Sequence, residues 1–534
     1  MRAELQAQLD ARSANQVTEF LLRLFKDIDP ENARGRVISA RELLDHGRVM
    51  LDKALGDEPR VRARLLSALG EIYTSIGVPQ SSVQLLESAV ALLRAPDADP
   101  LRLAFALNEL CRAYTATSDY PRARDACREA MALRQARLGP DDPDLGHTSL
   151  ALGVVEQDLS DFVAADKDYR QALAIFAAAG PGHREDLASA HHNLGFLAGQ
   201  RGDHTQARRE YQIALDAKRA LFGEAHPRTL NSLDGLAQSE QALGDLVAAR
   251  RDFESVLKLR VAVHGAESVA VAHSRNDLAG ALQDLGDYAA AETNYIAALD
   301  LYTRLEPPDA MDAASTSNNL ATLDEDRGDF AGALPLLQRS LAVRQGKFPP
   351  THPSLARAQH NLARCFLGLG DVGAARPLLD AALITRRALP QQNAERFDSE
   401  LLDAVWQLAA GHTDAAANAL RVLQPPQGRG NYRRRARYAE AMASVAAAQH
   451  DWVAARDSEQ QALMALRAEL AVDHPLCAQA AVRQAHYAHA LHDDDAAGAL
   501  LRGALLVLRK AMVERAVARV AAEKLAAELK VKAG

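Results

Sequence analysis

The sequence predicts an all-α solenoid of stacked helical hairpins, and three observations support this fold class. Aromatic residues make up only 5% of the 534 residues, and alanine and leucine are frequent, a mixture that favours packed helices over β-sheets. An aspartate recurs at one constant interval, and apolar and small residues recur in register with it. Because a period of about 20 to 50 residues marks a stacked-repeat protein, the length does not indicate several separate globular domains.

The repeated aspartates mark the turn inside each hairpin. Glycine precedes the aspartate in five repeats, and Ser118 and Ser160 take its place in the first two. Glycine can adopt the left-handed conformation that ends a helix, and an aspartate carboxylate can accept from the first amides of the next helix. Each turn therefore ends one helix and begins another. The aspartates are Asp119, Asp161, Asp203, Asp245, Asp287, Asp329 and Asp371.

The residues on both sides of the turn form the packing faces. Nine residues before each aspartate stands a leucine, which is followed directly by cysteine, glycine or alanine. Four residues after each aspartate stands an alanine, and later apolar positions such as Tyr169 and Leu173 are four residues apart. Small side chains allow close helix contact, and the spacing of four places apolar residues on one helical face. Each repeat is therefore predicted to be an amphipathic hairpin that must stack on its neighbours.

Proline marks the connections between hairpins. Asp142–Pro143, His226–Pro227 and His352–Pro353 are separated by whole multiples of the aspartate interval. Proline fits the first turn of a helix but interrupts a helix interior, because it lacks an amide hydrogen. These dipeptides therefore indicate where each new hairpin begins.

These signals together resemble the 42-residue tetratricopeptide repeats of kinesin light chains. The matching features are Asn-Leu-Ala in the first helix, a Leu-Gly-Asp-Tyr turn, the alanine-anchored second helix and the His-Pro connection. Residues 274–303 and 315–345 match best, and the resemblance extends over about residues 100–390. It implies a right-handed superhelical α-solenoid whose concave groove binds a protein or peptide partner.

The pattern divides the chain into four segments. We expect an N-terminal helical flank at residues 1–60, the repeat array at 61–390, degenerate repeats at 391–508 and a C-terminal capping helix at 509–534. The capping helix is predicted as part of one long helix from Leu500 to Lys530. Residues 17–73 also resemble the segment that joins kinase and repeats in some bacterial serine/threonine kinases, but no kinase motif is present. This resemblance implies an alternative role as the sensory, regulatory region of such a signalling protein.

Three asparagines are the candidate peptide-binding residues. In repeats of the resembled type, asparagines of the first helix contact the backbone of an extended peptide, and the matching residues are Asn193, Asn319 and Asn361. A side-chain amide both donates and accepts, so it can bind a peptide bond of any sequence. Gly235 and Asp277 depart from the pattern. The alternative is that these asparagines are solvent-exposed helix residues.

Cysteine and arginine patterns are assigned structural roles. The four cysteines lack Cys-x-x-Cys spacing, which predicts small buried thiols in a reducing compartment rather than a disulfide framework or a zinc site. The basic run from Arg429 to Arg437 predicts a solvated helix start, with contact to phosphate or RNA as the alternative. The cysteines are Cys111, Cys127, Cys365 and Cys477.

Motifs for catalysis, cofactors and metals each lack an essential part. Gly368–Gly373 satisfies G-x-G-x-x-G but follows a predicted helix, whereas the dinucleotide fingerprint requires a preceding strand. The histidines between residues 183 and 204 lack acidic residues at metal-ligand spacing. We therefore predict a chain that is not an enzyme and binds no cofactor and no metal.

Charge and hydropathy restrict the expected partners. The 62 basic and 70 acidic residues are spread along the chain, and the net charge of −8 argues against nucleic acid as a partner. No window approaches the run of about 18 apolar residues that a membrane span requires. We expect a cytoplasmic scaffold for a protein or peptide partner, and the pattern leaves self-association through the end repeats open.

Overall fold

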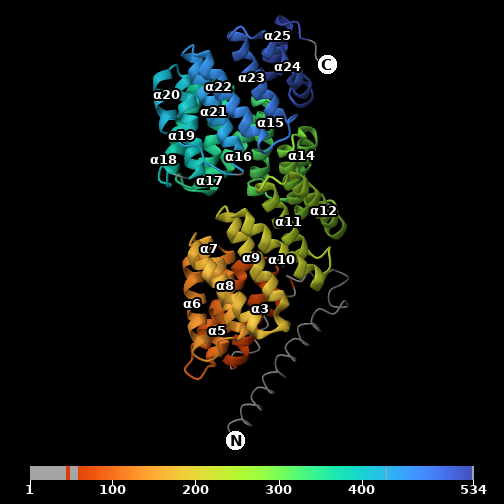
Figure 1. Ribbon diagram of the computed structural model, residues 1–534. Helices are drawn as coiled ribbons and strands as arrows, with labels where there is room; N and C mark the ends of the chain where they lie inside the picture. Colours follow the sequence, from red (N-terminus) through yellow and green to blue (C-terminus); the bar gives the residue numbers. More distant parts are fainter. Residues whose placement is uncertain (1–41, 43, 49–57, 392, 429, 532–534) are drawn as a thin grey trace. The chain divides into compact units, whose positions relative to one another are not determined.

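The computed structural model describes residues 42, 44–48, 58–391, 393–428 and 430–531. Helices and short turns account for these residues, and no strand occurs among them (Figure 1). Consecutive helices pair as antiparallel hairpins that stack along the chain, so the predicted all-α solenoid is confirmed. The chain forms two compact units that divide between Leu221 and Phe222. None of the described helices combines the length and the apolar character needed to cross a lipid bilayer.

The described part of unit 1 contains four helical hairpins. A short 3-10 helix, η1 (Pro181–His183), precedes the last of them. The paired helices are α3 (Pro59–Ser75) and α4 (Pro79–Leu93), α5 (Pro100–Ala116) and α6 (Tyr120–Gln135), α7 (Pro143–Asp158) and α8 (Phe162–Ala179), and α9 (Arg184–Gln200) and α10 (His204–Phe222).

Unit 2 continues the same architecture with seven described hairpins and a final single helix, α25 (Val517–Glu528). The paired helices are α11 (Pro227–Ala242) and α12 (Leu246–His264), α13 (Val269–Asp284) and α14 (Tyr288–Leu305), α15 (Met311–Asp326) and α16 (Phe330–Lys347), α17 (Pro353–Gly368) and α18 (Val372–Arg386), α19 (Ala394–Ala409) and α20 (Thr413–Val422), α21 (Tyr432–Ala448) and α22 (Trp452–Arg467), and α23 (Pro475–Ala490) and α24 (Asp494–Ala511).

The predicted turn chemistry is confirmed at six of the seven repeated aspartates, and Asp245 is the exception because its side chain makes no cap. Asp161 Oδ1 accepts from the amide of Ala164 at 3.1 Å, and Asp371 Oδ1 accepts from the amide of Ala374 at 2.9 Å. The residue before each of these aspartates is left-handed, with φ of 63° at Ser160 and 79° at Gly370. The turn therefore closes one helix and caps the next, as the alternation of glycine or serine with aspartate indicates.

The His-Pro connections contain caps that the sequence pattern did not predict. His226, His352 and His474 each precede a proline at the first position of a helix, and the imidazole Nδ1 accepts from the amide two residues later at 3.1 to 3.2 Å. An accepting Nδ1 requires the neutral tautomer that carries its proton on Nε2. Histidine thus replaces the usual aspartate or serine as the helix cap at these connections.

Small residues of the first helix make room for large residues of the second. A Cβ atom added to Gly153 on α7 would lie 2.5 Å from the ring of Tyr169 on α8, and one added to Gly195 on α9 would lie 3.0 Å from Tyr211. A side chain at Gly153 would force the tyrosine ring to move, and one at Gly195 would make an unusually tight contact. The small residue after each repeat leucine is therefore the contact point of the two helices, as predicted.

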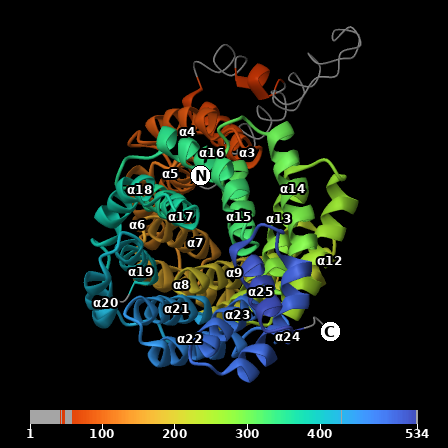
Figure 2. The same ribbon diagram turned by 90° about the horizontal axis from the view of Figure 1, so that it is seen from above.

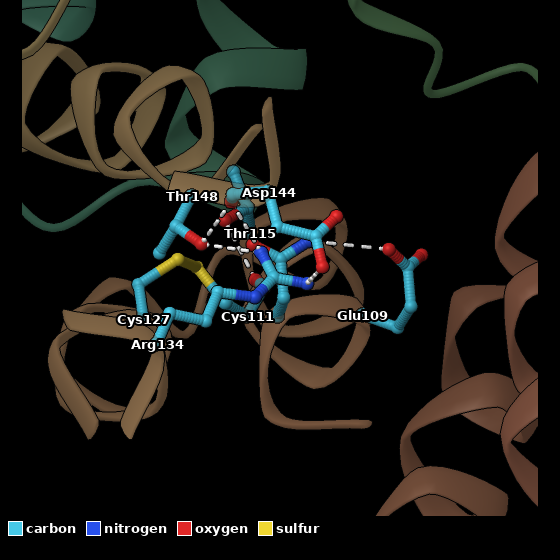
Figure 3. Close-up of a disulfide and its surroundings, with 8 residues drawn as sticks. Glu109, Cys111, Thr115, Cys127, Arg134, Asp144 and Thr148 are labelled. Carbon is cyan, nitrogen blue, oxygen red and sulfur yellow. Dashed lines mark hydrogen bonds and ion pairs between the residues drawn. A yellow bond between two sulfur atoms is a disulfide. The ribbon is translucent and has the colours of Figure 1, made fainter. Parts of the chain in front are cut away.

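Cysteines occupy both of these facing positions in the hairpin of α5 and α6. Cys111 and Cys127 form a disulfide across the hairpin, with their Cα atoms 5.4 Å apart (Figure 3). The prediction of buried thiols without a disulfide is therefore wrong for this pair, whereas Cys365 and Cys477 are free and buried. The repeat alignment carried the missed signal, because positions 111 and 127 are where the facing small residue and aromatic ring stand in the next repeats.

The long helix expected from Leu500 to Lys530 is divided into α24 and α25. Residues 512–516 leave the helical path at a contact with α15 and its turn. There the amide of Val513 donates to the carbonyl oxygen of Arg327 at 3.4 Å, and the Arg515 guanidinium pairs with Asp329 at 2.6 Å. Tertiary contacts thus override the helical propensity of this segment.

Candidate functional site

The first helices of the hairpins form the inner wall of unit 2. Curvature brings α23 beside α15, where Gln479 Nε2 donates to the carbonyl oxygen of Asp326 at 2.8 Å (Figure 1). In the view of Figure 2, α17, α19, α21 and α23 follow one another around this wall. A cavity of about 420 Å³ lies between these helices. Its principal polar lining residues are Glu325, Asp326, His360, Arg364, Asp398, Arg433, Arg437, Glu440, Gln479 and Arg483.

Ion pairs connect opposite sides of this wall. The Arg433 guanidinium on α21 binds Asp284 on α13 at 3.1 Å and Asp326 on α15 at 3.0 Å. Asp326 also accepts from Gln283 Nε2 at 2.8 Å, and its pKa is lowered despite burial, chiefly because of Arg433. Both carboxylates are partly or fully withdrawn from water, and Arg433 is the ion-pair partner that they share, while the charge of Arg437 also lowers the pKa of Asp326. Arg433 therefore connects α21 to two hairpins more than 100 residues earlier.

Two further arginines of the cavity have acidic partners. Arg364 on α17 pairs with Glu325 on α15. Arg483 on α23 pairs with Glu459 at 3.0 Å and with Glu440 at 3.3 Å. Burial raises the pKa of Glu325, and the buried Glu325 Oε1 has no hydrogen-bond partner among the described residues.

Arg437 differs from the other arginines of the lining. It projects from α21 into the cavity, and no described acidic group lies within ion-pair distance of its guanidinium. Burial, followed by the charge of Arg364, lowers the pKa of Arg437 to about 10, although the carboxylates of Asp326 and Asp398 act in the opposite direction. At neutral pH Arg437 is still a cation; the carboxylates of Asp326 and Asp398 supply its counter-charge without forming a direct ion pair with it.

Part of the lining is apolar. Leu401, Leu402, Val405 and Leu408 face the cavity from α19, and Phe330 contributes from α16. These side chains cannot hydrogen-bond, so this side suits an apolar group. The cavity lining thus combines hydrophobic and charged side chains.

His360 is a neutral polar group of the cavity wall. Its Nδ1 lies 3.1 Å from Ser399 Oγ, and its side chain is buried. Burial, reinforced by the charges of neighbouring arginines, lowers the pKa of His360 well below its ordinary value. His360 therefore contributes a hydrogen-bonding group rather than a charge at neutral pH.

The predicted asparagines lie on first helices but do not line this cavity. Asn319 Nδ2 on α15 donates to Asn276 Oδ1 at 3.1 Å, and Asn361 Nδ2 on α17 donates to Asn318 Oδ1 at 2.8 Å. Both bonds join adjacent repeats. Asn193 belongs to unit 1, on α9, where its side chain is half-buried. The structure thus gives two of the three amides an inter-repeat contact, and their role in binding a peptide stays a prediction.

The basic run near residue 433 is not a solvated helix start, which corrects the prediction. Arg434 pairs with Asp398 at 3.0 Å, and Arg435 pairs with Glu469 at 3.2 Å. Arg433 and Arg437 also extend from α21 toward the acidic inner wall. Arg429 lies outside the described residues. The recurrence of aspartate at positions 284 and 326, one repeat apart, was the available signal for an acidic partner.

Comparison with known families identifies the repeat. A model of the tetratricopeptide repeat matches residues 102–178, 186–260, 236–304, 268–346 and 312–387, which together span more than half of the chain. The chain belongs to the tetratricopeptide-repeat family. These TPR matches begin at residue 102, and most of residues 17–73 lies outside the described residues. The resemblance of that segment to a kinase linker therefore stays a prediction.

Two solved structures are similar to part of this TPR chain. BtubC (BKLC) from P. vanneervenii is 26% identical, covering 44% of this chain and 91% of its own, with a TM-score of 0.35. A putative kinesin light chain with nearly identical TPR-like repeats from Podospora anserina is 23% identical, covering 39% and 97%, with a TM-score of 0.33.

A third similar structure extends over more of the TPR chain. The apo form of the quorum sensor NprR from B. thuringiensis is 12% identical and covers 67% of this chain and 97% of its own, with a TM-score of 0.52. This likeness indicates a shared fold. No curated protein matches the chain.

Proposed function

We propose that the chain is a non-enzymatic scaffold that binds a peptide or protein partner on the concave face of its TPR array. The observation that carries this proposal is the inner wall of unit 2, where hydrogen-bonding and charged side chains of successive first helices surround a cavity of about 420 Å³. Stacked repeats characteristically use such concave surfaces for binding. A cavity of this size is within the usual range for ligand sites.

Asn193, Asn319 and Asn361 are the proposed contacts to the partner's backbone. Asn319 and Asn361 each use an amide hydrogen for the neighbouring repeat, and each also carries a carbonyl oxygen that can accept from a peptide N–H. The same amides stabilise the stacking of repeats, so substitution is expected to affect stability as well as binding. A test of binding must therefore include a test of folding.

The test compares partner capture from a cell lysate by the wild-type chain and by the triple variant Asn193→Ala, Asn319→Ala, Asn361→Ala. Asn418→Ala on α20 is the matched control, because Asn418 is exposed on a second helix. All chains must show equal helicity by circular dichroism. Partners that are lost with the triple variant and kept with the control support the proposal. Equal capture by all three chains would place binding elsewhere and refute the assigned residues.

The alternative role as a sensory region of a signalling protein uses the same concave face. It rests on the resemblance of residues 17–73 to a kinase linker, and a neighbouring reading frame that encodes a kinase would favour it. The cysteines do not support the proposed cytoplasmic location. Disulfides such as Cys111–Cys127 are uncommon in reducing compartments.

A further inference from the structure

The inference concerns a small-molecule ligand for the cavity of unit 2, and it starts from the charge balance of the lining. Four carboxylates and four guanidinium groups line the cavity. Three of the guanidinium groups have a direct carboxylate partner, and the carboxylates of Asp326 and Asp398 supply the counter-charge of Arg437. A charged ligand would therefore lose its hydration without meeting an uncompensated charge. This balance favours an uncharged ligand.

The lining keeps one hydrogen-bond acceptor and one donor available. Arg364 donates to Glu325 Oε2 at 2.9 Å, whereas the buried Glu325 Oε1 has no hydrogen-bond partner among the described residues. The Arg437 guanidinium lines the same cavity and forms no hydrogen bond to a described residue. A buried polar group without a partner is costly, so a ligand that bonds to both groups gains binding free energy.

The apolar part of the lining indicates the shape of the rest of the ligand. Leu401, Val405 and Leu408 line the cavity from α19, and their spacing of four and three residues places them on one helical face. At the rise of an α-helix this stripe is about 10 Å long. A linear alkyl chain of medium length can lie along such a stripe and remove it from water.

We propose that this cavity binds a small molecule in which an uncharged amide is joined to an alkyl chain. The amide oxygen accepts from Arg437, the amide N–H donates to Glu325 Oε1, and the chain lies along the apolar residues of α19. An amide both accepts and donates, and it brings no charge into a lining that is already balanced. The inference goes beyond the proposed function, because it adds a small-molecule ligand to a chain that is proposed to bind a protein or peptide partner.

The probe is octanamide, and each comparison compound changes one property of it. Octanoate carries a negative head group and octylammonium a positive one. Methyl heptanoate is uncharged and similar in size, but its ester can only accept a hydrogen bond. N-acetyl-leucine methylamide presents amides on a short peptide instead of on an alkyl chain. Each compound is titrated into the full-length chain at neutral pH by calorimetry.

We expect the wild-type chain to bind octanamide about tenfold more tightly than any comparison compound, the effect of one hydrogen bond to a charged group. Glu325→Gln should weaken octanamide about tenfold and leave methyl heptanoate unchanged, because the glutamine oxygen can face Arg364 while its NH₂ replaces the free acceptor. Arg437→Met should weaken both compounds, since both accept from the guanidinium. Arg357→Gln is the matched control, because Arg357 lies on α17 but is exposed and does not line the cavity.

Four outcomes would overturn the inference. They are binding of octanoate, octylammonium or N-acetyl-leucine methylamide as tightly as octanamide, equal binding of octanamide and methyl heptanoate, no binding of octanamide at millimolar concentration, and unchanged octanamide binding by a folded Glu325→Gln variant. If the variants fail to fold, the comparison of head groups in the wild-type chain still decides. A chain that captures a partner through the asparagines but binds no octanamide would refute this inference and leave the proposed function intact.

Discussion

The disulfide between Cys111 and Cys127 provides a quantitative test of how the hairpin of α5 and α6 is stabilised. The bond links residues 16 positions apart, and constraining a loop of this length in the unfolded chain contributes about 3 kcal/mol in the chain-entropy model. Because about 1.4 kcal/mol corresponds to a factor of ten in an equilibrium constant, reduction should increase opening of this hairpin about a hundredfold.

Amide hydrogen exchange of peptides from α5 and α6 measures this local opening without requiring two-state unfolding of the whole array. Exchange should accelerate when reductant is added to the wild-type chain. The variant Cys111→Ala should exchange at the accelerated rate with or without reductant, since alanine occupies the equivalent position at Ala237 and Ala279 and fits the helix contact. Exchange of α17 in unit 2 serves as the internal control and should not respond.

Alkylation of the denatured chain without reductant checks the bond itself. The chain purified under oxidising conditions should show two modified cysteines, Cys365 and Cys477, and four after reduction. Modification of all four before reduction would refute the disulfide. If the bond is present but reduction leaves exchange in α5 and α6 unchanged, the reasoning about its contribution is wrong.

Three further predictions concern packing, pH and ion pairing. Gly153→Val on α7 should destabilise unit 1 by about 1 to 3 kcal/mol in urea unfolding, because the added Cβ collides with the facing tyrosine ring. Gly199→Ala is the matched control, because a Cβ has room there, and it should stabilise unit 1 by about 0.5 to 1 kcal/mol. Burial raises the pKa of Asp324 to about 7, so the folded chain holds this proton more tightly than the unfolded chain, and stability should fall as pH rises from about 4 to 7. Asp324→Asn should remove this dependence and stabilise at pH 8 by about 1 to 2 kcal/mol after allowance for solvent screening; an unchanged pH profile would contradict the assignment. Arg433→Met should lower the free energy of unfolding by about 3 to 5 kcal/mol and speed hydrogen exchange in α21, because two carboxylates lose their ion-pair partner. The exposed Arg357→Gln should have little effect. Equal stability of the two variants would disprove this role of Arg433.

The sequence predicts much of the fold because each repeat is built from local signals. The turn at Ser160 and Asp161 needs a left-handed residue followed by a capping carboxylate, and these two adjacent residues are enough to predict it. The contact between Gly153 and Tyr169 follows from a spacing that is constant within each hairpin. The same spacing links Cys111 to Cys127, so the disulfide was also within reach of the repeat alignment once the cysteines were placed in it.

The candidate site was less accessible to sequence reasoning. Asn319 and Asn361 lie on first helices as their repeat position requires, but their bonds to the preceding repeat depend on how adjacent hairpins are rotated. The cavity at Arg437 depends on residues from five first helices, and these are far apart in the sequence. Its lining could not be grouped before the curvature of the array was known.

Sequence alone determined the helical hairpin, its repeat period and the residues that cap and pack it, because these interactions join groups within one repeat or its neighbour. Tertiary structure decided that Arg433 meets Asp284 and Asp326, that α24 and α25 separate at α15, and that Arg437 faces a cavity. The physical reason is that small rotations between successive repeats accumulate. A contact between repeats that are far apart in the sequence depends on the sum of these rotations, and the sequence of a single repeat does not specify that sum.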